Sequence, residues 1–281
     1  MPQIYQLLAT AKTISQQDSV NKEILTHLLG QDLVWLYRNF NSIQYDDQFQ
    51  QQYFNLVRQY AKGVPLGYLL GHVFFRGQKI LVDQKVLIPR PATELLVEKT
   101  LAYTTKLFGH KSLNVLDLGT GSGCIALSLA TTQPHWKITA SDVSQDALQV
   151  AQANLALHSI KNVQLVASDL FANLQGQQFD LVISNPPYID RVATTYEHQN
   201  LQYEPEIALF AEQHGLYFYQ QILGTIKQHL KQDFFVALEV GFDQKEPLAA
   251  MLAKIFKQNI YWFEKDDQDH WRFLFISSRK L

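Results

Sequence analysis

The segment Asn185-Pro-Pro-Tyr188 combines residue types that could hold a planar amino group. Two consecutive prolines fix φ and remove two backbone donors, so the segment is stiff and its carbonyl oxygens are available as acceptors. The Asn185 carboxamide oxygen and the Pro186 carbonyl oxygen could together accept both hydrogens of an NH2 group, with Tyr188 as an aromatic wall beside it. A rigid turn after a buried strand is the alternative. The unit as a whole, with Pro187 in its middle, favours a binding role.

A second group is a glycine turn that follows an apolar stretch at residues 113–118. Glycines reach positive φ and let the backbone approach a ligand closely at the carboxyl end of a strand. The third glycine of a dinucleotide fingerprint would fall at position 124, where Cys124 stands, which argues against NAD or FAD. Asp117 could hold the amino end of a ligand or cap the turn. The residues of this turn that we expect at a nucleotide-like ligand are Asp117, Gly119, Thr120, Gly121, Ser122 and Gly123.

Acidic residues end the next two predicted strands. Asp142 could accept hydrogen bonds from both hydroxyls of a ribose, and its charge disfavours a phosphate there. The alternative is a helix N-cap, since either Asp142 or Ser144 precedes a helical pattern at residues 145–157. Combined with the glycine turn, the ribose interpretation is favoured. Asp169 and Leu170 would lie against an adenine ring, with a loop cap as the alternative for Asp169.

The elements that must position these groups alternate between strands and helices from residue 113 onward. Strands predicted at residues 113–118, 137–141, 163–166, 179–184 and 234–239 alternate with helical patterns, which implies a parallel sheet covered on both faces. The last two strands, 260–264 and 271–276, are joined by a polar stretch too short for a crossover and must form an antiparallel hairpin. Such an α/β doubly wound sheet resembles the class I S-adenosylmethionine-dependent methyltransferase fold.

Upstream of this sheet the periodicity is helical. We expect an N-terminal helical domain for substrate recognition at residues 1–71, a hairpin connector at 72–90 and a catalytic domain at 91–281.

Composition excludes several classes of protein. With 47% hydrophobic and 18% charged residues and a net charge of −2, the chain is neither disordered nor a polyelectrolyte, and we expect no direct nucleic-acid binding. The single cysteine, Cys124, excludes an intrachain disulfide, and the scattered histidines give no metal site. Since there is no membrane-spanning stretch, and Met1–Ile14 lacks a signal-peptide pattern, we expect a cytoplasmic monomer.

Asn-Pro-Pro-Tyr is shared by enzymes that methylate amino groups conjugated to π systems. From about Tyr60 onward, the sequence resembles the peptide chain release factor glutamine N5-methyltransferase family. Two positions depart from that family's pattern: Ala92 replaces an acidic residue, and Ala211-Glu212 replaces a Gly-Gly pair. The matching stretches are Pro65-Leu-Gly-Tyr-Leu with Gly71 and Phe75, Val86-Leu-Ile-Pro-Arg-Pro-Ala-Thr-Glu94, Leu116–Gly123, Asn185–Ile189, Tyr203-Glu-Pro205, Ala208-Leu209 and Leu238-Glu-Val-Gly241 with Gln244.

The resemblance implies methyl transfer from S-adenosyl-L-methionine to the side-chain amide nitrogen of the glutamine in the Gly-Gly-Gln motif of class 1 release factors. Asn185, Pro186 and Tyr188 would be catalytic, and with Pro187 they would bind the substrate. Asn185 would also adjoin the cofactor. The alternatives are a glutamine methyltransferase of a ribosomal protein, an adenine N6-methyltransferase of nucleic acid, and a non-catalytic S-adenosylmethionine-binding adaptor. Glu204 and Glu239 are interpreted as structural, and Arg90 as either a pocket contact or a surface ion pair.

Overall fold

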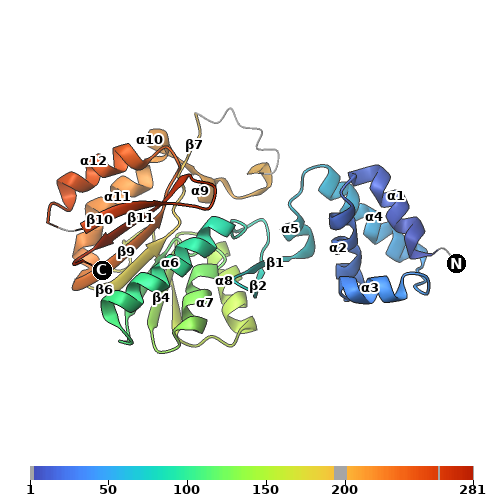
Figure 1. Cartoon of the computed structure of the whole chain (residues 1–281), viewed down its shortest axis with the longest axis horizontal. Helices are drawn as coiled ribbons and strands as arrows, with labels where there is room; N and C mark the ends of the chain where they lie inside the picture. The colour runs from blue at the N-terminus through green and yellow to red at the C-terminus, as the bar shows by residue number, and fades with distance from the viewer. Residues whose placement is uncertain (1–2, 193–200, 259, 281) are drawn as a thin grey trace. The chain divides into compact units, whose positions relative to one another are not determined.

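The computed structural model describes residues 3–192, 201–258 and 260–280, and these form two compact units (Figure 1). The first unit contains the described residues up to 72 together with 201–203, and the second contains the rest. Our proposed domain boundaries at residues 71 and 90 stay a prediction.

The first unit is a bundle of short helices, as the periodicity predicts. Its elements are α1 (Ile4–Ser15), α2 (Asp18–Leu29), α3 (Leu33–Asn39), α4 (Asp47–Ala61) and α5 (Leu66–Leu70). Local chemistry sets their ends: the Asp32 and Asp46 carboxylates accept hydrogen bonds from backbone N–H groups in the first turns of α3 and α4. Tyr53 is fully buried, and its hydroxyl donates to the Asn21 carbonyl at 3.1 Å. The bundle therefore has a core of its own.

The second unit is built on a seven-stranded sheet in the order β10-β11-β9-β6-β3-β4-β5. In this sheet β11 is antiparallel to both β10 and β9, and the other neighbouring pairs are parallel, which confirms the doubly wound sheet with a terminal hairpin. The strands are β3 (Asn114–Leu118), β4 (Lys137–Asp142), β5 (Val163–Ala167), β6 (Phe179–Ser184), β9 (Leu230–Glu239), β10 (Ile260–Lys265) and β11 (Trp271–Ser277).

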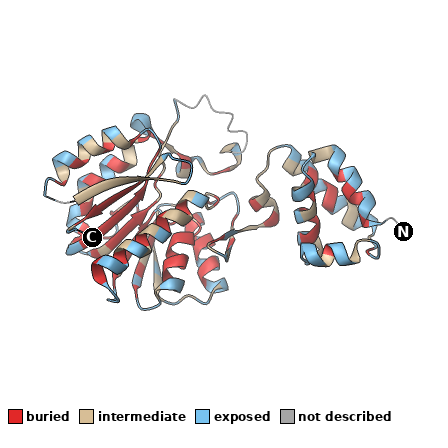
Figure 2. Ribbon diagram, viewed as in Figure 1, coloured by how far each residue is buried: buried red, intermediate tan, exposed pale blue. Residues whose placement is uncertain are grey.

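Helices cover both faces of this sheet (Figure 1). One layer contains α6 (Pro91–Phe108), α7 (Cys124–Thr132) and α8 (Gln145–Leu157); the other contains α11 (Tyr217–Thr225), the 3-10 turn η2 (Ile226–His229) and α12 (Lys245–Ile255). The central strands are buried almost throughout, because both of their faces are covered (Figure 2). Helix α6, which the sequence patterns left unassigned, runs beside β9.

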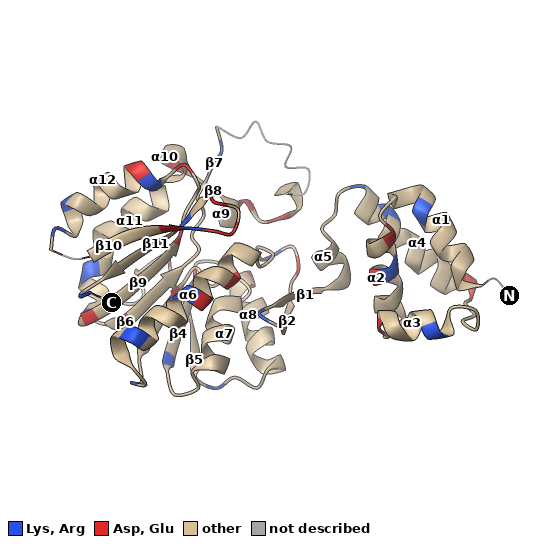
Figure 3. Ribbon diagram, in the orientation of Figure 1, with Lys and Arg blue, Asp and Glu red and all other residues tan. Residues whose placement is uncertain are grey.

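Basic and acidic residues are scattered over the elements of both units (Figure 3). The totals are nearly balanced, with 24 basic and 26 acidic residues.

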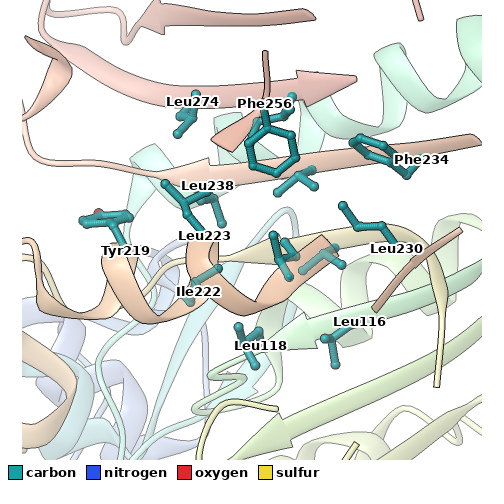
Figure 4. Packing of buried hydrophobic residues seen from close by; sticks show 14 of the residues in the cluster. Leu116, Leu118, Tyr219, Ile222, Leu223, Leu230, Phe234, Leu238, Phe256 and Leu274 are labelled. Atoms are coloured by element: carbon teal, nitrogen blue, oxygen red, sulfur yellow. The ribbon is translucent and has the colours of Figure 1, made fainter. Parts of the chain in front are cut away.

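An apolar cluster of buried side chains fills the space between the sheet and the layer of α11 and α12. Figure 4 shows how side chains from strands and helices meet there. This packing fixes the carboxyl ends of β3 and β6, from which the site is built. Labelled members are Leu116, Leu118, Tyr219, Ile222, Leu223, Leu230, Phe234, Leu238, Phe256 and Leu274.

A hairpin of β1 (His72–Phe75) and β2 (Gln78–Leu81) lies within the predicted connector, and Gly77 has φ +74° in its turn. Asn154 on α8 is fully buried and pairs with both the N–H and the carbonyl of Leu81, at 2.7 and 2.9 Å. The same carboxamide also donates to the Ser122 carbonyl at 2.8 Å. One side chain thus ties β2 to the glycine turn.

The stretch after Asn185-Pro-Pro-Tyr188 forms short elements: β7 (Ile189–Asp190), η1 (Leu201–Tyr203), α9 (Glu206–Leu209), β8 (Phe210–Ala211) and α10 (Glu212–Gly215). Ala211 has an ordinary extended backbone with φ −133°, so replacing the family's glycine there costs no strain. Gly215 is constrained instead: its φ is +78°, and a Cβ at this position would lie 2.1 Å from the Tyr188 carbonyl oxygen.

Candidate active site

A cavity of about 330 Å³ lies at the carboxyl ends of β3, β4, β5 and β6. In open α/β sheets this edge is where ligands bind, and the volume falls at the lower end of the range for small-molecule sites, about 300–1,000 Å³. The sequence-predicted residues that line it are Gly119, Gly121, Asp142, Asp169, Leu170, Asn185, Pro186 and Pro187. The structure therefore brings the nucleotide-like group and the amide-binding group into one space.

The glycine turn has the backbone conformation that only glycine adopts freely. Gly119, Gly121 and Gly123 have φ of +72°, +55° and +81°. At Gly119 and Gly121 an added Cβ would meet no atom within 4 Å, which leaves their pocket side open to a ligand. At Gly123 it would lie 3.1 Å from the Ala151 Cβ, because α7 and α8 approach closely there.

Asp117 lies behind this turn and is fully buried. Its Oδ2 accepts hydrogen bonds from the Thr120 hydroxyl at 2.6 Å and the Ala126 N–H at 3.0 Å, so the carboxylate joins the turn to the first residues of α7. Burial raises the pKa of Asp117 to about 7. Asp117, Thr120, Ser122 and Gly123 are outside the pocket lining and shape the turn from behind. Their direct contact with a ligand stays a prediction.

Asp142 lines the cavity at the end of β4. Its Oδ2 accepts from the Gly121 N–H at 2.8 Å, and its Oδ1 accepts from the Ser144 N–H at 2.9 Å. Ser144 is the N-cap of α8, since its hydroxyl accepts from the Ala147 N–H, so the helix cap falls at Ser144 and not at Asp142. Contact between Asp142 and a ribose stays a prediction. A carboxylate accepts about four hydrogen bonds, which leaves capacity for a diol. Burial raises the pKa of Asp142.

Asp169 and Leu170 line the cavity beyond β5. The Ser168 hydroxyl donates to the Leu170 carbonyl at 2.8 Å and accepts from the Asn173 N–H at 3.0 Å, so Ser168 supplies the side-chain capping of this loop. Leu170 has φ +46°, a conformation rare for leucine. Leu170 and Ile222 both line the cavity and give part of it an apolar surface.

The Asn185 segment follows β6 directly. The Ser184 hydroxyl donates to the Leu118 carbonyl at 2.6 Å, which fixes the ends of β6 and β3 together. Asn185, Pro186 and Pro187 line the cavity, whereas Tyr188 packs its ring against the apolar cluster and is outside the lining. A role for Tyr188 at the substrate stays a prediction.

Two residues that the sequence interpretation left out of the site contact this segment. The Asn185 Nδ2 donates to the Thr93 hydroxyl at 3.1 Å, and that hydroxyl donates to the Glu239 Oε2 at 2.7 Å. The Tyr188 hydroxyl donates to the other Glu239 oxygen, Oε1, at 3.2 Å. Thr93 and Glu239 both lie in stretches that match the family pattern, but their pairing spans 146 residues of chain and no local pattern reveals it.

Glu204 has the structural role that we inferred. It is buried, pairs with the Arg90 guanidinium and accepts from the Ile88 N–H at 3.1 Å. This contact holds the segment before α6 against the stretch that carries Pro205, which lines the cavity.

Within the described ranges, no group of three or more potential ligand side chains could hold a metal ion, and no helix is long and apolar enough to cross a membrane.

Comparison with known proteins places these features in a family. Residues 3–71 match the family model for the PrmC N-terminal domain, and residues 90–202 match that for the methyltransferase small domain. The chain is 37% identical to the release factor glutamine methyltransferase of Lactococcus lactis, covering 83% of this chain and 84% of that protein. It is 35% identical to the protein of the same name from Shewanella oneidensis, covering 84% and 81%.

Solved structures share the fold at lower sequence identity. A methyltransferase from Pyrococcus furiosus is 20% identical with a TM-score of 0.53, covering 83% of this chain and 98% of that one. The 16S rRNA methyltransferase RsmC of T. thermophilus, solved in complex with AdoMet and guanosine, is 22% identical with a TM-score of 0.52, covering 74% and 50%. The sheet order, the glycine turn, the Asn-Pro-Pro-Tyr segment and the identity to curated relatives agree: the chain belongs to the release factor glutamine methyltransferase family, a family of S-adenosylmethionine-dependent enzymes.

Proposed function

We propose that this enzyme methylates the side-chain amide nitrogen of the glutamine in the Gly-Gly-Gln motif of class 1 peptide chain release factors. The observation that carries the proposal is the shared cavity, in which Asp142 and the glycine turn adjoin Asn185 and Pro186. The names of the relatives from Lactococcus lactis and Shewanella oneidensis describe the same chemistry.

The residues of the cavity fit S-adenosylmethionine. Asp142 keeps lone pairs for the two ribose hydroxyls, and Leu170 offers an apolar surface for the adenine ring. The open side of Gly119 and Gly121 leaves room for the amino acid portion, with Asp117 behind the turn. When bound, the cofactor supplies a methyl group on a positively charged sulfur.

Asn185 and Pro186 would prepare the amide nitrogen of the substrate. That nitrogen is a weak nucleophile, because its lone pair is delocalised into the carbonyl group. Acceptance of its two hydrogens by the Asn185 Oδ1 and the Pro186 carbonyl oxygen would direct the lone pair at the methyl group and favour the positive charge that develops on nitrogen. Transfer of the methyl group would form the N–C bond as the C–S bond breaks, and one amide proton would then leave to water. Orientation of this kind contributes roughly 7–11 kcal/mol at best, so a strong base is unnecessary.

The first unit would recognise the partner protein. A glutamine on a loop tip offers little surface, whereas specific complexes bury about 1,200–2,000 Å² in total. Helix α3 of this unit exposes three large apolar side chains: Leu33, Val34 and Tyr37 are 46%, 57% and 59% accessible. We therefore assign partner recognition to this unit, and we place a monomeric enzyme in the cytoplasm with its substrate and without direct nucleic-acid binding.

Parallel assays with labelled S-adenosylmethionine would test this function. Purified release factors, ribosomal proteins and DNA are incubated separately with the enzyme, and the modified atom is located by mass spectrometry. We expect label only in the release factor, on the amide of its Gly-Gly-Gln motif, and none when that glutamine is replaced by glutamate. Labelling of adenine or of a ribosomal protein would contradict the proposal and indicate a methyltransferase for that acceptor. Cofactor binding with no methyl transfer to any acceptor would indicate a non-catalytic adaptor.

A further inference from the structure

We propose that Thr93 and Glu239 are positioning residues that set which end of the Asn185 carboxamide faces the substrate. The inference rests on the proposed function, because it concerns how Asn185 accepts a hydrogen from the substrate amino group. Both residues are outside the cavity lining and act through Asn185.

The direction of each hydrogen bond follows from the chemistry of the groups. An ionised carboxylate only accepts, so the Thr93 hydroxyl donates its single hydrogen to the Glu239 Oε2 at 2.7 Å. The Thr93 oxygen then has only lone pairs to offer to Asn185. It accepts from the Asn185 Nδ2 at 3.1 Å, and this turns the Asn185 Oδ1 away from Thr93.

The position of Glu239 is itself strongly constrained. Its side chain is buried at the end of β9, and its second oxygen accepts from the Tyr188 hydroxyl at 3.2 Å. Its backbone carbonyl accepts from the Tyr219 hydroxyl at 2.8 Å. Burial raises the pKa of Glu239, and the hydrogen bonds from Thr93 and Tyr188 and the Arg272 and Arg90 guanidinium groups oppose this rise by favouring the charged form.

The N-terminus of α6 lies beside the Glu239 carboxylate, to which its first turn is hydrogen-bonded. Thr93 lies in the first turn of α6, an 18-residue helix, and Glu239 is hydrogen-bonded to that turn. The positive end of a helix dipole favours an anion at this place. The Glu239 oxygens are therefore placed as acceptors for hydroxyls from two different parts of the chain, Thr93 on α6 and Tyr188 after β6.

This arrangement selects between two orientations of a carboxamide that have nearly the same shape. If the Asn185 amide rotated by 180°, its NH2 group would meet the NH2 group of the substrate, and the acceptor would be lost. Nothing in the volume of the side chain prevents that rotation. The Thr93 oxygen does, because it offers Asn185 only lone pairs.

Paired substitutions separate positioning from packing. Thr93→Val keeps the shape and removes the hydroxyl, whereas Thr93→Ser keeps the hydroxyl and removes a methyl group. Thr100→Val is the matched control, because Thr100 is also buried on α6 but its hydroxyl donates to the Leu96 carbonyl of the same helix. Glu239→Gln is a second test, since the amide that it introduces could donate to Thr93 and reverse the direction of both hydrogen bonds.

The kinetic measurements are kcat and KM for a methyl acceptor, and calorimetry gives the cofactor affinity. NMR of the full-length protein follows the side-chain NH2 resonances of Asn185, which are assigned by their loss in Asn185→Ala. We expect Thr93→Val and Glu239→Gln to lower kcat about 10- to 100-fold, with cofactor affinity unchanged. Thr93→Ser should stay within about threefold of the wild type, as should Thr100→Val. The Asn185 NH2 resonances should shift in Thr93→Val and not in Thr100→Val.

Two results would overturn the inference. One is a kcat for Thr93→Val close to that of Thr100→Val with unshifted Asn185 resonances; the other is a larger loss in Thr93→Ser than in Thr93→Val, which would indicate packing. If Thr93→Val does not fold, Glu239→Gln and Thr93→Ser decide by the same readouts. If the wild type methylates an acceptor other than a release factor, the proposed function fails, whereas the kcat ratios on that acceptor and the resonances still test the positioning.

Discussion

Replacing Asp142 by alanine should weaken binding of S-adenosylmethionine while leaving the enzyme folded. The wild-type carboxylate lines the cavity and has two lone pairs left after its bonds to the Gly121 and Ser144 N–H groups. Hydrogen bonds to a charged group contribute roughly 1.5–3 kcal/mol each, so two ribose bonds could account for about 3–6 kcal/mol. Water partly replaces them in an open cavity, so we expect a smaller loss of about 1.4–2.7 kcal/mol, which is about a 10- to 100-fold rise in Kd.

The same substitution removes two acceptors inside the protein. Loss of the bonds to Gly121 and Ser144 should lower the free energy of unfolding by about 1–3 kcal/mol, because the glycine turn is held to β4 through one of them. Thermal unfolding therefore has to accompany the calorimetry. Asp142→Asn keeps the shape and one acceptor oxygen, and its Kd should be intermediate.

Asp146→Ala is the matched control for this experiment. Asp146 is an exposed carboxylate in the first turn of α8 and is outside the cavity lining, so its removal should change the Kd by less than about fivefold. An unchanged affinity in folded Asp142→Ala would refute the reasoning, since Asp142 would then only hold the turn. Equal losses in both variants would point to a general effect of negative charge near the cavity.

Four further outcomes are expected. Asn185→Ala should lower kcat about 10²–10³-fold while the protein stays folded, and near-normal turnover by the folded variant would contradict the proposed mechanism. The raised pKa of Asp117 means that the folded chain binds this proton more tightly than the unfolded chain, so the stability contributed by the group falls as pH rises from 3.8 to about 7. In denaturant titrations, the free energy of unfolding of Asp117→Asn should vary less with pH over that range than that of the wild type, by at most about 4 kcal/mol. An equal pH dependence in both proteins would mean that another group, and not Asp117, titrates there. Gly215→Ala should destabilise the protein and lower activity, because its Cβ would lie 2.1 Å from the Tyr188 carbonyl oxygen; an unchanged melting temperature would show that the loop adapts. Val34→Asp should raise KM for an intact release factor and leave a short glutamine peptide unaffected, whereas equal effects on both would argue against partner recognition by the first unit.

Much of the fold follows from patterns that are local in sequence. Strand and helix periodicities are set by which side chains meet the core, and they predict the helical first unit, the doubly wound sheet and the terminal hairpin. Helix α6 was left unassigned, although its boundary residues Arg90 and Pro91 belong to a stretch that matches the family pattern. Within the site, the glycine turn and the Asn185 segment are also local, because stiffness and positive φ are properties of a few consecutive residues.

The sequence by itself therefore determined the elements, the type of cofactor turn and the residue types that could hold an amino group. The tertiary structure alone decided which of these groups face the cavity. Asp117 is turned behind the glycine turn, and Tyr188 toward the apolar cluster. It also decided that Glu239 reaches Asn185 through Thr93, since this contact depends on where β9 lies in the sheet and on how α6 begins beside it. Strand order and helix packing are set by the whole core. The sequence around Thr93 and the sequence around Glu239 therefore do not reveal that these two residues, 146 positions apart, are hydrogen-bonded.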